Sequence, residues 1–469
     1  MVVLDFIRSV QPNPDSYFII SENKNITYKE LYSLIKKTSS YFRGIGIKEN
    51  DIVSLLFENS SEFIITVLSL WQIGAVPVPL NIRLLEHDLT EQINFLNPSL
   101  TIKSQNLKDI SLHGKVVGFD YKNTSENLEV IPSNFSKEKT ALILFTSGSS
   151  GKPKAVMLSF NNLVQSAVIG NKILNHNQNE RWLASLPFYH IGGFSIFFRA
   201  IMFGASVILP QSLSHQHLIE ALQKYKPTFV SLVSNQLMYI VDNQITPPDE
   251  LKTVLLGGGF TDSQLILKAI DFGWKIAKVY GSTETSSFVT FMDTDEVKKK
   301  PGASGKAIPP NKIVLTDEGE ITIQSPAVMK GYYKNEEESN VKLKDDFYYS
   351  GDLGKIDDEG YLFVEAKRND LIVSGGENIN PFEVEEAILS NNKVKEVCVV
   401  GINDKQWGQI LSAVIVLKEK NSMTENEMKN YLSEKLASYK IPKNILFTEH
   451  LPKSGLGKYL REEIKNLFK

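Results

Sequence analysis

One run of hydroxyl, glycine and lysine residues is the part of this sequence best suited to chemistry. It reads Thr146-Ser147-Gly148-Ser149-Ser150-Gly151-Lys152-Pro153-Lys154 and follows an apolar stretch at residues 141–145. Hydroxyls, lysines and backbone N–H groups can bind a polyphosphate, and glycines let the backbone come close to it. The run is not a Walker A loop, because its glycine spacing is short and Pro153 follows Gly151-Lys152. Its place after a buried strand favours a phosphate loop over a flexible surface loop.

Further motifs with nucleotide-binding character follow along the chain. They are Gly257-Gly258-Gly259, Tyr280-Gly281-Ser282-Thr283-Glu284-Thr285, Tyr349-Ser350-Gly351-Asp352-Leu353-Gly354, Lys367-Arg368-Asn369-Asp370, and Pro452 to Arg461. Glu284 is an oxygen donor of the kind that binds Mg²⁺, although alone it would be read as a charge at a helix start. Tyr280 offers an apolar face to a purine. Taken singly, the glycine triplet and the Gly-Asp pair would be turns, and Lys458 would be one solvated lysine among many.

In this order the motifs resemble the signature of the adenylate-forming superfamily, which includes acyl-CoA synthetases, peptide-synthetase adenylation domains and firefly luciferase. The resemblance covers essentially the whole chain. It implies an enzyme that turns a carboxylic acid into an acyl-adenylate and then into a CoA thioester, with ATP, Mg²⁺ and the co-substrate coenzyme A. It also implies that Lys458 stabilises the negative charge that develops as the carboxylate attacks the α-phosphate of ATP.

The resemblance assigns roles to individual residues. The catalytic residues are Lys458, Glu284 and Thr146, and Glu284 is also the metal ligand. The nucleotide-binding residues are Thr146, Ser147, Gly148, Ser149, Ser150, Gly151, Lys154, Gly257, Gly258, Gly259, Tyr280, Gly281, Thr283, Asp352, Lys367 and Lys458. Asp352 is expected to accept hydrogen bonds from the ribose hydroxyls.

Two departures from the family pattern bear on these roles. Lys367 stands where the family usually has Arg, and a lysine cannot form the bidentate fork of an arginine. Either Arg368 substitutes for it or nucleotide affinity is weaker. Ala155 replaces a glycine after the phosphate loop, which is a small and harmless change.

The family mechanism also implies a mobile C-terminal domain. We expect a large N-terminal domain at residues 1–366, a hinge at residues 367–370 and a small domain at residues 371–469. Rotation about Asp370 would withdraw Lys458 after adenylation and bring Ser374, Gly375 and Gly376 to the channel for the CoA thiol. Pro381 to Glu385 is expected to start a helix.

The acid itself is read from the segments around the expected substrate pocket. His190, Gly258 and Arg83 are the candidate substrate contacts. An aromatic-cluster role for His190 and a structural surface role for Arg83 are equally compatible with the sequence. Four segments resemble the 2-succinylbenzoate–CoA ligase subfamily of menaquinone biosynthesis: Leu186 to Gly193, Leu255 to Gly259, Ser374 to Ile379 and Asp404 to Gly408. That acid is a dicarboxylate, so a second anion-binding group is required.

Four alternatives are weighed at this point. A luciferase-type oxygenase would share the catalytic machinery of the family, but nothing in the sequence argues for light emission. Another aryl- or medium-chain acyl-CoA ligase would share every motif except the pocket. A stand-alone amino-acid adenylation domain would need an acidic residue near Val233 to Leu237, where the chain has none. A binding protein of the same fold is disfavoured, because Glu284, Asp352 and Lys458 are all present.

Composition excludes several other classes. The 469 residues include 51 Lys and Arg against 54 Asp and Glu. This composition lacks the excess of positive charge that is typical of nucleic-acid-binding proteins. The single cysteine, Cys398, lies in an apolar run and is expected to be a buried thiol. Residues 63–80 are largely apolar, but Gly74, Pro77 and Pro79 favour a buried helix and strand over a membrane span. We therefore expect a cytoplasmic enzyme whose partners are small molecules; a homo-oligomer is compatible with the sequence.

The elements that must position these residues alternate between helix and strand, which indicates an α/β fold. We expect a multi-layer N-terminal domain with αβαβα-type subdomains, a small β-rich subdomain from Ala303 to Val364, and a small α+β C-terminal domain. Thr27 and Glu30 have the spacing of a capping box before a helix that runs to about Phe42. Residues 110–136 are expected to form an irregular surface excursion.

Overall fold

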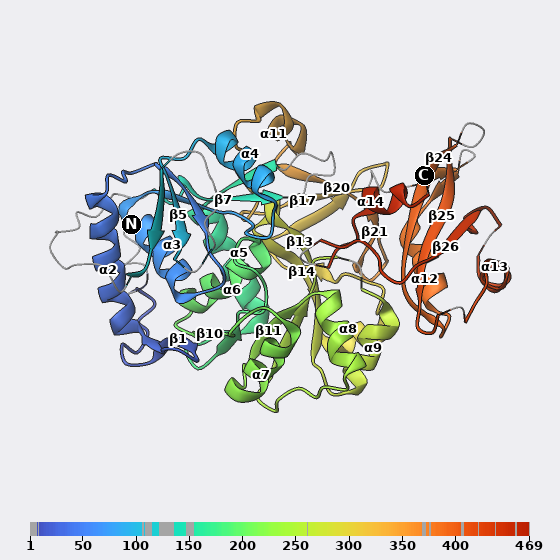
Figure 1. The fold of residues 1–469 in the computed structure, drawn as a ribbon, viewed down its shortest axis with the longest axis horizontal. Coiled ribbons are helices and arrows are strands. Elements are labelled where there is room, and N and C mark those ends of the chain that lie inside the picture. Colours follow the sequence, from blue (N-terminus) through green and yellow to red (C-terminus); the bar gives the residue numbers. More distant parts are fainter. Residues whose placement is uncertain are drawn as a thin grey trace.

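The computed structural model describes residues 7, 9–105, 107, 115–121, 136–146, 154–259, 261–367, 372–374, 377–404, 408–420, 422–436, 438–454 and 457–468. Helix α2 lies toward one end of the molecule, and the C-terminal unit, coloured orange to red, lies at the other (Figure 1). Most of the excursion expected at residues 110–136 falls outside the described residues.

The largest sheet has nine strands in the order β15-β14-β13-β12-β11-β9-β10-β1-β2. Its strands are β15 (Lys306–Ala307), β14 (Ser287–Met292), β13 (Ile276–Ser282), β12 (Thr253–Leu256), β11 (Phe229–Leu232), β9 (Arg181–Leu183), β10 (Ser206–Leu209), β1 (Tyr17–Ser21) and β2 (Ile26–Thr27). From β13 to β1 every pairing is parallel. The carboxyl ends of these parallel strands therefore meet at one edge of the sheet, which is where such sheets bind ligands.

Helices connect the strands of this sheet and cover it. They are α5 (Phe160–Leu174), α6 (Ile191–Met202), α7 (His215–Tyr225), α8 (Ser234–Asp242), α9 (Ser263–Asp271) and α10 (Thr294–Lys299), with the one-turn 3₁₀-helix η2 (Thr283–Thr285). Helix α6 is buried along almost its whole length, because nearly all of its residues are apolar.

A second layer contains a parallel sheet of four strands and an antiparallel sheet of three. The four strands are β4 (Val76–Pro79), β3 (Ile52–Leu56), β5 (Leu100–Ser104) and β6 (Val116–Phe119), and the three are β18 (Gly331–Tyr332), β8 (Lys154–Ser159) and β7 (Thr140–Thr146). Helices α2 (Tyr28–Gly44), α3 (Ser61–Ile73) and α4 (Glu86–Leu96) belong to this part of the chain. One continuous core joins it to α6, with Trp71 packed edge-on against Phe194 and Phe198.

A five-stranded antiparallel sheet follows, as expected for the β-rich segment. It consists of β16 (Lys312–Leu315), β17 (Glu320–Gln324), β19 (Leu343–Lys344), β20 (Phe347–Ile356) and β21 (Leu362–Lys367), with helix α11 (Glu336–Lys342) between β18 and β19.

The C-terminal unit has its own sheet and its own core. Its strands are β22 (Ile372–Ser374), β23 (Glu377–Ile379), β24 (Val394–Asp404), β25 (Gly408–Leu417) and β26 (Asn444–Phe447), and its helices are α12 (Pro381–Leu389), α13 (Glu425–Ser433), η4 (Ser438–Lys440) and α14 (Arg461–Asn466). Pro381 occupies the first turn of α12, which confirms the predicted helix start.

Several local predictions are confirmed. The Thr27 side chain accepts from the Glu30 N–H while the Glu30 carboxylate accepts from the Thr27 N–H, so the capping box is complete. Cys398 is buried. The apolar stretch near residue 70 forms α3 and β4, and among the described residues no helix is both long and apolar enough to cross a bilayer.

Candidate active site

The ends of the phosphate loop are fixed by a β-hairpin. Thr146 closes β7 and Lys154 opens β8, and the two residues are paired across the antiparallel strands. The Lys154 ammonium forms a half-buried ion pair with the Glu338 carboxylate and lies 5.4 Å from the centre of the Tyr332 ring. Ser147, Gly148, Ser149, Ser150 and Gly151 lie outside the described residues.

Glu284 lies in η2, directly after β13, and is largely buried. The Tyr332 hydroxyl donates to Glu284 Oε1 at 3.0 Å, and the Glu284 carbonyl accepts from the Met329 N–H at 2.7 Å. Burial and the neighbouring Glu284 charge raise the pKa of Tyr332 well above its usual value, so its hydroxyl stays protonated and donates. Because Tyr332 also contacts Lys154, this one side chain connects the phosphate loop to the candidate metal ligand.

The turn around Glu284 leaves no room for larger residues. A Cβ atom on Gly281 would lie 2.0 Å from the Ser287 carbonyl oxygen. The Thr285 hydroxyl donates to that same oxygen at 2.7 Å, and the buried Arg199 donates to the Ser287 hydroxyl at 2.8 Å. Thr283 is the first residue of η2. These contacts fix the backbone that presents Glu284.

Tyr280 and Asp352 are joined by a hydrogen bond. The Tyr280 hydroxyl donates to Asp352 Oδ2 at 2.7 Å, and burial, followed by the Asp352 charge, raises the pKa of Tyr280. The backbone before Asp352 is held by Gly351, whose φ of +78° favours glycine and whose N–H donates to Glu320 at 2.9 Å. Asp352 is also paired in register with Lys367, of which only the backbone is described. The motifs that contain Tyr280 and Asp352 are thus joined by a hydrogen bond.

The glycine triplet lies at the carboxyl end of β12 and is in contact with Lys458. Gly257 is pressed against Val279, where a Cβ atom would lie 2.8 Å from Val279 Cγ2, and Gly258 has a φ of +88°. A Cβ atom on Gly259 would lie 3.8 Å from Lys458 Cγ. The C-terminal unit therefore places Lys458 alongside the carboxyl edge of the main sheet.

Two further contacts join the units near this point. Gly457 has a φ of +78° and lies against the Asn235 side chain, where a Cβ atom would be 2.8 Å from Asn235 Cγ. The Ser263 hydroxyl, at the start of α9, donates to Glu386 of α12 at 3.3 Å. The connection from β12 to α9 and the first turn of α8 thus form the surface on which the C-terminal unit rests.

His190 lies within the electrostatic influence of two cations, Lys458 and Arg83. It is the residue before α6, where Gly193 passes so close to Pro187 that a Cβ atom would lie 2.1 Å from the Pro187 carbonyl oxygen. Burial, then the Lys458 charge and then the Arg83 charge lower the pKa of His190 to about 4. The imidazole is therefore neutral at pH 7, with its ring centre 4.8 Å from that of Tyr189.

These observations bring most of the described candidates together. His190 follows β9, Gly258 follows β12, and Glu284 follows β13, all at the carboxyl edge of the parallel strands. Arg83, which precedes α4, acts electrostatically on both His190 and Tyr189. Asp370, Gly375 and Gly376 lie outside the described residues, whereas Ser374 ends β22 and pairs with Gly408.

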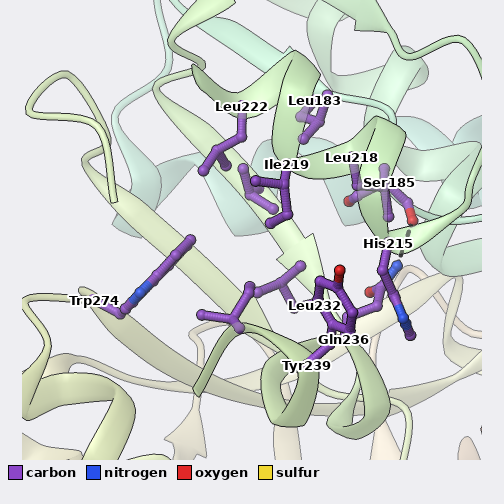
Figure 2. Close-up of a pocket in the computed structure, with 12 residues that line it drawn as sticks. Leu183, Ser185, His215, Leu218, Ile219, Leu222, Leu232, Gln236, Tyr239 and Trp274 are labelled. Atoms are coloured by element: carbon purple, nitrogen blue, oxygen red, sulfur yellow. Dashed lines mark hydrogen bonds between the residues drawn. The ribbon is translucent and has the colours of Figure 1, made fainter. Parts of the chain in front are cut away.

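A small cavity elsewhere in the large unit is a packing gap rather than a substrate pocket (Figure 2). It lies between α7, α8 and the sheet, beside the stacked rings of His215 and Tyr239 and the hydrogen bond from Gln236 to the Ser185 carbonyl. Its volume is about 20 Å³, which is room for one water molecule and not for an acid.

Two residues of the site were missed by sequence reasoning. Tyr332 contacts both Glu284 and Lys154, and Glu338 pairs with Lys154. Neither belongs to a recognisable motif. The only signal is the Gly331-Tyr332-Tyr333 run, which any buried strand could contain.

Two family models match the chain. The model of the AMP-binding enzyme covers residues 6–333, and the model of the AMP-binding enzyme C-terminal domain covers residues 383–458. The chain belongs to the AMP-binding enzyme family. The resemblance to adenylate-forming enzymes is therefore confirmed, and the protein is an AMP-forming acyl-CoA ligase.

Curated and solved relatives are similar over their whole length. The 2-succinylbenzoate–CoA ligase of Bacillus thuringiensis subsp. konkukian (strain 97-27) is 33% identical over 467 residues, which cover 97% of this chain and 96% of the relative. The o-succinylbenzoate CoA synthetase from Bacillus subtilis is 29% identical and has a TM-score of 0.91 in two complexes, one with the acyl-adenylate intermediate OSB-AMP and one with ATP and magnesium ion. These structures cover 98% of this chain and 97% and 99% of their own chains, which confirms the predicted fold class.

A third structure of the B. subtilis enzyme has a lower TM-score. A double mutant bound to the product analogue OSB-NCoA covers 98% of both chains at 29% identity, yet its TM-score is 0.74.

A first prediction concerns Glu284. The change Glu284→Gln keeps an acceptor for the Tyr332 hydroxyl and removes the charge. We expect the apparent Mg²⁺ affinity in the adenylation reaction to fall by about tenfold or more. Titration of activity with Mg²⁺ measures this, with the exposed Glu336→Gln in α11 as the control. An unchanged Mg²⁺ dependence would remove Glu284 from the metal site.

Proposed function

We propose that this ligase activates 2-succinylbenzoate, forming its adenylate from ATP and then its CoA thioester, as its similar relatives are named to do. One observation supports a dicarboxylate in particular. Lys458 and Arg83 both act electrostatically on His190, so two cations lie near this candidate substrate contact. A single cation would suffice for a simple aryl or alkyl acid, whereas the second carboxylate of 2-succinylbenzoate requires another.

The residues of this chain divide the chemistry among them. Lys458, beside Gly259, would stabilise the charge that forms at the α-phosphate when the carboxylate attacks and pyrophosphate leaves. Thr146, the described Lys154 and the glycine-rich run between them would hold the phosphates. Asp352, positioned by Tyr280, would accept from the ribose hydroxyls. Arg83 and His190 would orient the acid.

Magnesium fits the donor set at Glu284. A buried carboxylate that accepts from the Tyr332 hydroxyl suits a hard cation that takes its remaining ligands from phosphate and water. When bound, Mg²⁺ supplies neutralisation of the phosphate charge. Within the described residues there is no group of three or more His, Cys, Asp or Glu side chains that could hold a metal without such outside ligands.

The later half-reaction requires a second arrangement. We place the hinge at residues 367–370, with Asp370 as its pivot, between a large domain at residues 1–366 and a small one at residues 371–469. Rotation there would clear Lys458 and bring Ser374, Gly375 and Gly376 toward the CoA thiol. We further propose a cytoplasmic enzyme of menaquinone biosynthesis, with no nucleic-acid partner.

The role of Lys458 can be tested by separating the half-reactions. Lys458→Ala removes the ammonium that acts only during adenylation. We expect ATP–pyrophosphate exchange to fall by about 100-fold or more, while turnover of synthetic acyl-adenylate plus CoA stays close to wild type. If both half-reactions fell equally, the assignment of two arrangements would be wrong.

The identity of the acid is tested by assaying a panel of carboxylic acids in the presence of ATP and CoA. With AMP release as the measurement, we expect kcat/KM for 2-succinylbenzoate to exceed that for benzoate and octanoate by about 100-fold or more. A preference for octanoate would instead assign the chain to medium-chain acids. A preference for benzoate would remove the need for a second cation.

Arg83 provides an independent test of the second carboxylate. We expect Arg83→Ala to raise KM for 2-succinylbenzoate by about tenfold, the scale of one charge-assisted hydrogen bond, and to leave KM for benzoate unchanged. Arg43→Ala, in the last turn of α2, is the matched control. Equal effects on both acids would show that Arg83 does not discriminate between them.

A further inference from the structure

Arg461, three residues after Lys458, turns away from the nucleotide site and into the C-terminal unit. It is the first residue of α14, and its guanidinium donates to the Val399 carbonyl through Nη1 and to Glu385 Oε1 at 2.9 Å through Nη2. The exposed fractions of the two side chains are 14% for Arg461 and 1% for Glu385, so the ion pair is largely removed from water. Such a pair has defined geometry, because an arginine fork donates two bonds in fixed directions.

The pair binds both backbone polar groups of one residue in β24, Val399. Glu385 Oε1 also accepts from the Val399 N–H at 2.8 Å, so Glu385 takes the N–H of Val399 while Arg461 takes its carbonyl. Among the described strands, β24 lies at the edge of its sheet and pairs only with β25. Edge backbone groups need partners. Here α12 and α14 supply them, and the start of α14 is fixed to the sheet at Val399.

Lys458 lies on a hairpin that leads directly into Arg461, the residue fixed to Val399. Lys453 pairs with Tyr459, and the Leu460 N–H donates to the Pro452 carbonyl at 3.0 Å. The Ser454 N–H donates to the Lys458 carbonyl at 2.7 Å, and the Tyr459 ring packs on the small core around Cys398. The Lys458 backbone is therefore set by the hairpin, and Arg461 fixes the C-terminal end of that hairpin to β24 beside the Lys453–Glu396 ion pair.

We propose that Arg461 and Glu385 are positioning residues. They hold the hairpin that carries Lys458 in the position from which the Lys458 ammonium reaches the reacting phosphate. This rests on the proposed adenylation function and adds to it. The reason is geometric, because the Lys458 side chain reaches the phosphate only if its backbone is correctly placed. An error of about 1 Å in the position of a reacting group can lower a rate by about 100-fold. The main core of the unit, around Val384, Ile388 and Ala413, is built from other residues.

The design of the variants follows from the buried charge. Arg461→Lys keeps a cation opposite Glu385 but loses the fixed fork, and Arg461→Ala loses both. Glu385→Gln keeps an acceptor for the Val399 N–H and removes the charge. Lys465→Ala, on the same short helix and paired only with the exposed Glu462 among the described ion pairs, is the matched control.

The test compares the two half-reactions, because both need the C-terminal unit folded but only adenylation needs Lys458. We expect Arg461→Ala to lower pyrophosphate exchange by about 100-fold and Arg461→Lys by a smaller factor, with turnover of synthetic acyl-adenylate plus CoA retained. Glu385→Gln should follow Arg461→Lys, and Lys465→Ala should match wild type. A parallel fall in both half-reactions, or no fall in either, would overturn the proposal.

A second measurement needs no acid at all. In the full-length protein with ATP and Mg²⁺, we expect trypsin to cleave after Lys458 faster in Arg461→Lys than in wild type, with cleavage after the other lysines unchanged. An unchanged rate after Lys458 would contradict the anchoring role. If the wild-type chain adenylates none of the acids, the proposed function is contradicted. The rate of trypsin cleavage after Lys458 then still tests whether Arg461 anchors the hairpin.

Discussion

The proposed catalytic arrangement depends on the approach of Lys458 to Gly259, where a Cβ atom on the glycine would lie 3.8 Å from Lys458 Cγ. The lysine and Gly259 are far apart in the chain and belong to two units with separate cores. A cation of one unit can act at the edge of the other only if nothing bulky lies between them. Glycines at residues 257–259 meet that condition, because they present backbone instead of side chains.

The carboxyl edge of the parallel sheet explains why the remaining groups converge there. Strands β9, β11, β12 and β13 end side by side and lead into His190, Asn235, the glycine triplet and Glu284. The smaller sheets then contribute across this edge: β8 begins with Lys154, and β18 carries Tyr332 between Lys154 and Glu284. Asp352 comes from β20 and is tied to β13 through Tyr280. Each charge-bearing group is thus supplied by a different rigid element.

The sequence predicted the parts that depend on local rules. The capping box at Thr27, the strand before Thr146 and the helix start at Pro381 follow from residue types at short spacing. The motifs also predicted which residues share the site, because their order matched a family. Contacts that depend on packing between distant segments were not predictable. Tyr332 reaches Glu284 across 48 residues and Arg461 reaches Glu385 across 76, and the local sequence of neither residue indicates that distant partner.

The way Gly457 rests on Asn235 has a consequence for turnover. The contact consists of bare backbone against one amide, with the glycine held at a positive φ. An apolar patch of the same size would hold the two units together in proportion to the area that it hid from water. Backbone against an amide buries little apolar surface, so this contact contributes little hydrophobic free energy to holding the two units together. A contact of this composition lets the two units separate and return to the same position repeatedly.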